Sequence, residues 1–327
     1  MTEAADLPHL QLAPFRIEPR FVVRVWGFKD LRPWYDRVAD LEPLGEVWLT
    51  GDDCVIATGA HKGQTLGSLF ATAPLDMLGT AQSTGSPLLV KMIFAREKLS
   101  VQVHPDDKMA QSLGQPRGKT ECWYALAAEP GAQVAAGVKP GVTLEQIKTE
   151  IHDGTLEKSL NVLPVAAGDM VFVDAGTVHA IWPGSILLET QQNSDVTYRM
   201  YDYGRARELH IEKSLEATRL VTHAGKVPPI ELADRTVLIN VDDFRVERLP
   251  VLASRLSKTL PSQGEPAHGL SYLFAASGEG RLIGPEFEPV DLPARGIVAV
   301  PASSPAFIVQ DMGLLDLIRI APNRPKN

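Results

Sequence analysis

Cysteine is almost absent from this 327-residue sequence, which contains only Cys54 and Cys122. Two cysteines are too few for a disulfide framework, and they favour a reduced, cytoplasmic compartment. No stretch approaches the roughly 18 apolar residues of a membrane span, and the acidic N-terminus lacks the apolar core of a signal peptide. Basic residues are also in deficit, with 32 Lys and Arg against 40 Asp and Glu. The resulting net charge of −8 argues against a nucleic-acid partner, and we expect no membrane partner either.

The overall composition is that of an ordinary globular protein, with 44% hydrophobic and 22% charged residues. Such a chain can bury an ample core, and its length favours about two domains. An acidic protein that binds an anionic substrate needs a local cluster of basic side chains. Clustered Arg and Lys residues are therefore informative in this sequence.

Residues 100–104 read Ser-Val-Gln-Val-His and alternate polar with apolar side chains, as a half-buried strand does. Gln102 and His104 therefore project from one face of the predicted strand. Pro105 cannot donate a ladder hydrogen bond, so the strand ends there. The stretch places a carboxamide and an imidazole side by side on one surface.

Glu121 opens the next predicted strand, which covers residues 120–126 and follows a short helix that begins at the Asp pair 106–107. A hairpin-like return of the chain brings the Glu121 carboxylate beside His104. Cys122, the next residue in the strand, points to the opposite face.

A second histidine follows a separate strand. Residues 168–169 form a turn, 170–173 an apolar strand and 174–176 a tight turn, after which His179 opens another strand. Two histidines and a carboxylate suit Zn²⁺, but also Fe²⁺, Mn²⁺ or Ni²⁺, and the oxygen of Gln102 does not discriminate among them. The alternative is that each histidine is simply packed or hydrogen-bonded within its strand.

The sequence also contains the motifs GEVW, LSVQVHPDD, GKTECWY, AGTVHAI and QQNSDVTYRMYDYGR. With these motifs it resembles the type I mannose-6-phosphate isomerases, in particular the short bacterial class, over about residues 16–225 and more weakly towards the C-terminus. The resemblance implies a mainly β fold of two cupin barrels (double-stranded β-helix or jelly roll), with a small helical insertion and a few helices. It also implies one zinc ion, or another divalent metal, per chain, and a monomer or homodimer.

The activity implied by the resemblance is the interconversion of mannose 6-phosphate and fructose 6-phosphate through an enediol or enediolate. We assign four residues to the metal: Gln102, His104, Glu121 and His179. By similarity to the family, Arg199 is an active-site residue that holds the phosphate or stabilises negative charge. Lys119 and Asp195 are candidates for ring opening and proton handling, and Glu189 is a candidate acid or base.

Basic residues provide the pocket that a sugar phosphate requires, because the planar guanidinium binds phosphate through paired hydrogen bonds. The candidates for this pocket, besides Lys119 and Arg199, are Lys91, Arg117 and Arg205. Lys91 interrupts an apolar strand predicted over residues 87–95, and it either extends to the surface or, as the resemblance implies, lies near the site. The alternative for Arg199 and Arg205 is an ordinary ion pair, which for Arg199 would involve Asp195 or Asp202.

Two domains are expected. The metal-binding domain covers residues 1–230, with a helical insertion at about 61–82 over the barrel mouth, and a helix over 207–223 links it to the second domain. Residues 231–327 alternate short strands with Gly and Pro and form a cupin-like domain. We expect that domain to be metal-free, because it lacks a ligand set such as His-x-His and its His268 stands alone.

Two other function classes remain open at this stage. The first is an Fe²⁺-dependent dioxygenase on a cupin fold, although such sites commonly use three histidines and would leave the basic residues idle. The second is a non-catalytic protein with two cupin barrels that binds a sugar phosphate. Residues 50–54 depart from the family pattern, which leaves room for a sugar phosphate other than that of mannose.

Overall fold

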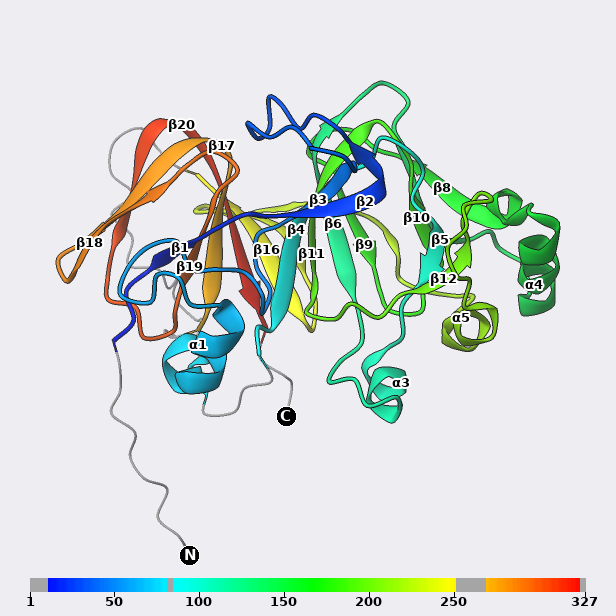
Figure 1. Cartoon of the computed structure of the whole chain (residues 1–327), viewed down its shortest axis with the longest axis horizontal. Helices are drawn as coiled ribbons and strands as arrows, with labels where there is room; N and C mark the ends of the chain where they lie inside the picture. The colour runs from blue at the N-terminus through cyan, green and yellow to red at the C-terminus, as the bar shows by residue number, and fades with distance from the viewer. Residues whose placement is uncertain (1–10, 81–84, 251–268, 324–327) are drawn as a thin grey trace, which may run out of the picture.

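The computed structural model describes residues 11–80, 85–250 and 269–323, which form a mainly β structure built from three sheets (Figure 1). His268 and the last two residues of the predicted 61–82 insertion lie outside these described ranges. None of the helices in the described ranges is long and apolar enough to cross a membrane.

The central sheet has seven antiparallel strands. In spatial order they are β13 (Gly225–Val227), β9 (Met170–Val173), β6 (Glu121–Ala128), β11 (Ser185–Gln192), β4 (Leu88–Phe94), β3 (Leu44–Trp48) and β2 (Arg20–Phe28). Every residue of β4 is buried, as expected for a strand that is covered on both faces. The sheet therefore separates two cores.

A five-stranded antiparallel sheet faces one side of the central sheet. Its strands, in spatial order, are β12 (Tyr198–Tyr201), β5 (Val101–Val103), β10 (His179–Ile181), β7 (Gln133–Val138) and β8 (Leu160–Pro164). Trp123 and Val171 of the central sheet pack with Val134 and Ile181 of the five-stranded sheet in one buried cluster. The polar residues of the candidate site line the same space between the two sheets.

The third sheet contains eight strands and covers the other side of the central sheet. Seven of them follow the order β1 (Phe15–Ile17), β19 (Ile297–Val300), β17 (Ser271–Gly284), β20 (Ile308–Pro322), β16 (Phe244–Leu249), β15 (Thr236–Asn240) and β14 (Ile230–Glu231), while β18 (Phe287–Leu292) pairs with β17. The N-terminal strand β1 thus completes a sheet that otherwise comes from the C-terminal third of the chain.

The central and third sheets pack through apolar side chains. Cys122 and Tyr124 on the outer face of β6 share a buried cluster with Tyr272, Phe274 and Ile320. Cys122 therefore points away from Glu121 and the candidate site, as the strand alternation predicts. The third sheet buttresses the strand that carries Glu121.

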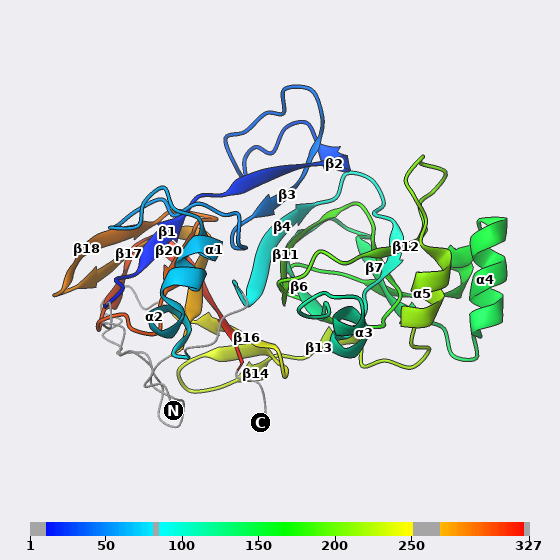
Figure 2. The same cartoon turned by 60° about the horizontal axis from the view of Figure 1, so that its bottom comes forward.

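The helical insertion is present but lies against the third sheet. It consists of α1 (Leu66–Thr72) and α2 (Pro74–Leu78). The carbonyl oxygens of Asp76 and Met77 accept hydrogen bonds from the backbone N–H groups of Ser303 and Ala302 at 2.9 and 3.0 Å. Both views show these helices beside the third sheet (Figures 1 and 2), so the expectation that they cover the mouth of the first barrel is wrong.

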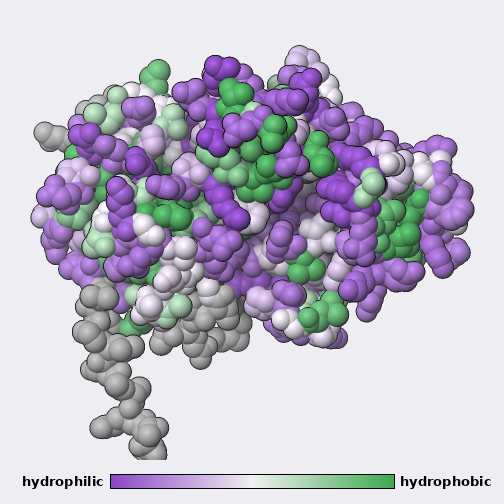
Figure 3. All heavy atoms as spheres, viewed as in Figure 1, coloured by the Kyte–Doolittle hydropathy of each residue, from purple (hydrophilic) through white to green (hydrophobic). Residues whose placement is uncertain are grey.

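The other helices surround the five-stranded sheet. They are α3 (Asp107–Ser112), α4 (Leu144–Asp153), the 3₁₀ helix η1 (Leu156–Ser159) and α5 (Ile211–Ala217). Ile147 and Ile151 of α4 and Ala217 of α5 pack on the outer face of that sheet, and Figure 2 shows both helices at the far side of the molecule from α1 and α2. The helix predicted over 207–223 is thus shorter than expected, and it covers the outer face of the five-stranded sheet. On the face shown in Figure 3, hydrophobic residues form only separate patches among hydrophilic ones.

Candidate metal centre and active site

Two imidazoles and one carboxylate converge between the central and five-stranded sheets. His104 directly follows β5, Glu121 opens β6 and His179 opens β10. One potential ligand atom from each residue lies within 4.8 Å of the others, and all three residues are buried. Three segments far apart in the sequence therefore meet at one point, as the strand patterns predict.

Backbone carbonyls fix the orientation of both imidazoles. Nδ1 of His104 lies 2.9 Å from the carbonyl oxygen of Val196, and Nδ1 of His179 lies 2.9 Å from that of Thr177. A carbonyl can only accept, so each Nδ1 carries the proton and each Nε2 presents its lone pair to the site. Burial and the charge of Lys119 hold the pKa of His104 well below its usual range, and burial lowers the pKa of His179 to about 4. Both rings are neutral at physiological pH, which is the form that binds a metal.

Gln102 extends this set. It lies opposite His179 in the β5–β10 pair, and its Nε2 is 3.1 Å from Nε2 of His179. The carboxamide therefore lies at the edge of the group formed by the two imidazoles and the carboxylate, as predicted from the alternation of residues 100–104.

Lys119 shows that this donor set attracts a cation. Its ammonium group is 2.9 Å from Nε2 of His104 and contacts the carboxylate of Glu121, while that carboxylate is 3.3 Å from Nε2 of His179. Neutral imidazole and ionised carboxylate are common zinc ligands. The chemistry of these side chains fits a divalent metal ion, and the ligands would be His104, Glu121, His179 and Gln102.

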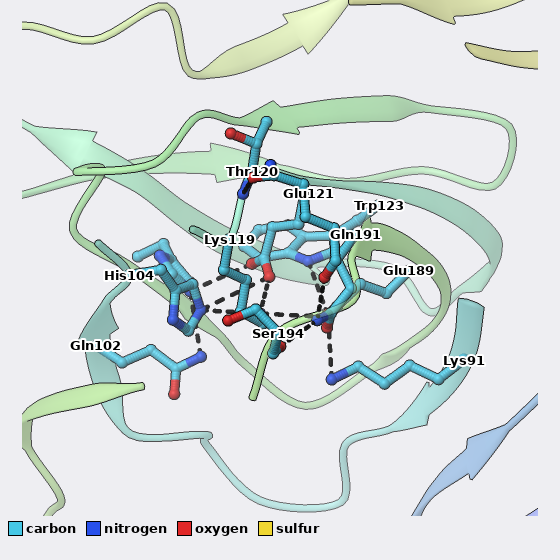
Figure 4. Close-up of polar contacts among 12 residues, drawn as sticks. Lys91, Gln102, His104, Lys119, Thr120, Glu121, Trp123, Glu189, Gln191 and Ser194 are labelled. Atoms are coloured by element: carbon cyan, nitrogen blue, oxygen red, sulfur yellow. Dashed lines mark hydrogen bonds and ion pairs between the residues drawn. The ribbon is translucent and has the colours of Figure 1, made fainter. Parts of the chain in front are cut away.

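A second buried charge cluster adjoins the first (Figure 4). Oε1 of Glu189 lies 3.0 Å from Nζ of Lys91 and 3.6 Å from Nζ of Lys119. Its Oε2 accepts a hydrogen bond from the indole N–H of Trp123 at 3.1 Å. Burial and the charge of Glu121 raise the pKa of Glu189. Lys91 and Lys119 lower it, but the effects that raise it are larger. A carboxyl group with a raised pKa next to two ammonium groups is suited to proton transfer.

Glu46 is a buried residue of this cluster that the sequence did not reveal. It accepts hydrogen bonds from Nη2 of Arg24 and from the indole of Trp48, each at 2.8 Å, and its carboxylate is 3.7 Å from Nζ of Lys91. Burial opposes ionisation, but Lys91 and Arg24 outweigh it and hold the pKa of Glu46 at about 2. The GEVW motif contains this residue, although only the pairing of β3 with β4 shows that it faces Lys91.

Arg199 lies on the same surface as the metal-binding candidates. It is the cross-strand partner of Gln102 in the β12–β5 pair, so the two side chains share the face that looks towards the central sheet. Its Nη1 donates to the carbonyl oxygen of Glu208 at 2.8 Å. Burial and the neighbouring Arg207 lower the pKa of the guanidinium. The acceptor of this hydrogen bond is a backbone oxygen and not Asp195 or Asp202, the ion-pair partners considered from the sequence.

Arg205 and Arg117 make hydrogen bonds and ion pairs with residues outside this cluster. Arg205 is 2.9 Å from Asp202 and donates to the carbonyl oxygen of Lys98 at 2.7 Å. Arg117 donates to the carbonyl oxygen of Pro87 at 2.8 Å. Asp195 is exposed in the loop between β11 and β12, next to Val196, whose carbonyl holds His104. Their roles in substrate binding or proton handling stay predictions.

Comparison with known proteins agrees with the geometry. Residues 28–136 match the family model of the catalytic domain of type I phosphomannose isomerase. The chain is 34% identical over 262 residues to a mannose-6-phosphate isomerase of Streptococcus mutans, which covers 76% of this chain and 82% of that protein. This chain belongs to the mannose-6-phosphate isomerase family.

Solved structures extend the likeness to the fold. The mannose 6-phosphate isomerase of Bacillus subtilis superposes with a TM-score of 0.82 at 27% identity, over 94% of this chain and 99% of that one. A mannose 6-phosphate isomerase bound with zinc and yttrium shares the fold at 17% identity, with a TM-score of 0.74 over 96% of this chain and all of the other. As a member of the mannose-6-phosphate isomerase family, the chain is an isomerase.

Proposed function

We propose that the protein is a metal-dependent aldose–ketose isomerase that interconverts mannose 6-phosphate and fructose 6-phosphate. The observation that carries the proposal is the convergence of His104, Glu121 and His179 within 4.8 Å. Next to them, the buried lysines Lys91 and Lys119 lie close to the carboxylate of Glu189. Membership in the mannose-6-phosphate isomerase family supports the choice of substrate.

The reaction moves a proton between C1 and C2 of the sugar while the two oxygens exchange carbonyl and hydroxyl character through an enediol or enediolate. A divalent ion, proposed to be Zn²⁺, supplies a Lewis acid for such oxygens when bound. The chain would bind this ion through the neutral imidazoles of His104 and His179, whose tautomers are fixed, together with the Glu121 carboxylate and the Gln102 carboxamide. The zinc-bound relative of the same fold supports this choice of metal.

Proton handling is assigned to the charge cluster around Glu189. Its raised pKa and its contacts with Lys91 and Lys119 make it the proposed acid or base, since positioned proton transfer contributes on the order of 10²–10⁴-fold to a rate. Lys119 and Asp195 are proposed to assist ring opening. Arg199, which shares the face of Gln102, is proposed to hold the phosphate or to stabilise negative charge as it develops.

We also propose that the fold consists of two cupin barrels. The facing central and five-stranded sheets correspond to the metal-binding barrel within residues 1–230, and the third sheet corresponds to a metal-free barrel within 231–327 that also includes β1. The overall likeness to the Bacillus subtilis enzyme supports this assignment.

The test is a coupled assay of fructose 6-phosphate formation from mannose 6-phosphate, with and without a chelator. We expect turnover that is lost after chelation and restored by Zn²⁺. A rate that is unchanged after complete removal of metal, or no turnover by the metal-loaded protein, would refute the proposal.

A further inference from the structure

Gln191 lies on the inner face of the central sheet but has no role in the site as described so far. It is the cross-strand partner of Glu121 in the β11–β6 pair and is completely buried. Its position next to a metal-ligand candidate raises the question of what its carboxamide does.

The carboxamide nitrogen binds the loop that follows β11. Nε2 of Gln191 donates to the carbonyl oxygens of Gln192 and Ser194 at 3.0 and 2.7 Å. Because both partners are carbonyls, which only accept, the amide cannot be reversed without losing both hydrogen bonds. The side chain thus fixes the course of the loop at two successive points.

The same loop holds His104. Val196 lies two residues beyond Ser194, and its carbonyl oxygen accepts from Nδ1 of His104 at 2.9 Å. Figure 4 shows Gln191, Ser194 and His104 around the same site. Residues 193–197 form no helix or strand and Asp195 among them is exposed, so the contacts that Gln191 makes at the start of the loop help to place the Val196 carbonyl.

We infer that Gln191 is a positioning residue for the metal ligand His104, acting through the loop between β11 and β12. By fixing the carbonyls of Gln192 and Ser194, it keeps the Val196 carbonyl where it holds the Nδ1–H tautomer of His104 and directs Nε2 into the site. Loss of a group that orients a ligating histidine typically weakens metal binding 10–100-fold. The inference rests on the metal site of the proposed function, but not on its substrate.

The test compares two near-isosteric Gln to Met changes in the full-length protein. Gln191→Met removes both N–H donors. The control Gln146→Met removes a carboxamide of α4 that makes two side-chain hydrogen bonds, to Glu150 of α4 and to Ser159 of η1. The Zn²⁺ dissociation constant is measured by competition with a chromogenic chelator. We expect it to rise about tenfold in Gln191→Met and to stay within twofold of the wild-type value in Gln146→Met.

A second readout separates positioning from general loosening of the fold. In ¹⁵N-labelled metal-free protein, the Nδ1 resonance of His104 should shift in Gln191→Met because its hydrogen bond to the Val196 carbonyl weakens, while the ammonium of Lys119 still favours the Nδ1–H tautomer. The thermal midpoint of the metal-free variant serves as the measure of folding. If Gln191→Met does not fold, Gln191→Asn, which keeps a polar amide but shortens its reach, takes its place with the same expected direction.

An unchanged Zn²⁺ affinity in a folded Gln191 variant, or an unchanged Nδ1 resonance of His104, would overturn the inference. Neither result depends on turnover of mannose 6-phosphate. Failure of the positioning role is therefore distinguishable from failure of the proposed activity, which the wild-type assay tests alone.

Discussion

Gln102 and His179 lie directly opposite each other in β5 and β10, with 3.1 Å between Nε2 of the carboxamide and Nε2 of the imidazole. On its other side Gln102 lies opposite Arg199 of β12. One row across the five-stranded sheet therefore presents an arginine, a carboxamide and an imidazole to the space where Glu121 enters from the central sheet. A slip of one residue in either pairing would send part of this row to the outer face, so strand register assembles half of the site.

Replacing His104 with Ala removes the proposed metal ligand, which the Val196 carbonyl orients. Loss of an orienting group alone costs 10–100-fold in metal affinity, so we expect loss of the ligand to weaken Zn²⁺ binding by more than about 100-fold and to abolish turnover. Metal content after gel filtration and the coupled assay measure both effects. Retention of metal together with a near-normal rate would show that His104 is not a ligand.

Trp123→Phe tests the proton-handling role of Glu189. The indole N–H is 3.1 Å from the Glu189 carboxylate, and a donor to a carboxylate stabilises its ionised form. Its removal should raise the pKa of Glu189 further, so a reaction that needs ionised Glu189 should lose activity at the acidic end and shift its acidic limb to higher pH. The measurement is kcat against pH at saturating Zn²⁺. An acidic limb at the wild-type pH would count against Glu189 as the base.

Phe274→Ala tests how far the third sheet supports the central sheet, which carries Glu121. Phe274 is completely buried in the cluster that also contains Cys122 and Tyr124 of β6. Truncation of a buried Phe to Ala costs about 3–5 kcal/mol, which thermal or urea unfolding should detect. The control Leu314→Ala changes a side chain that is 91% exposed, and it should cost less than about 0.5 kcal/mol. Equal stabilities of the two variants would contradict the buttressing role.

The local part of the site was readable from the sequence. Alternation over residues 100–104 predicted Gln102 and His104 on one face, and the same rule predicted that Cys122 points away from Glu121. Both are confirmed. These outcomes depend on neighbours in one strand. The role of Glu46 depends instead on the pairing of β3 with β4, which no local pattern specifies.

The third sheet shows the same limit more strongly. The strand β1 pairs with β19, a partner about 280 residues later in the chain, and nothing in three residues encodes that choice. Glycine locally favours a turn, but the segment around Gly278 continues within β17 as an irregularity in its pairing with β20. Gly278 has a φ of 66°, and a Cβ there would lie 2.3 Å from the carbonyl oxygen of Gly313. A glycine that signals a turn locally therefore serves close strand approach in the folded protein.

Asp243 provides a prediction on stability against pH. It lines a polar pocket with Asp107 and Thr120, and burial, with the charges of Asp107 and Asp242, raises its pKa to about 6. Its ordinary value is 3.8, so between about pH 4 and pH 6 the folded protein binds more protons at this position than the unfolded chain. Stability must then fall as the pH rises through this window and stay reduced above it.

Asp243→Asn should remove that penalty. Because solvent still reaches part of the side chain, we expect a gain of about 1 kcal/mol at pH 8, or roughly 1–3 °C in Tm, and no gain near pH 4. The exposed carboxylate of Asp40 offers the control Asp40→Asn, for which the two pH values should give the same small difference from wild type. The gain in stability of Asp243→Asn over wild type should be larger at pH 8 than at pH 4. Equal gains at the two pH values would show that the ionised Asp243 carboxylate does not destabilise the folded protein.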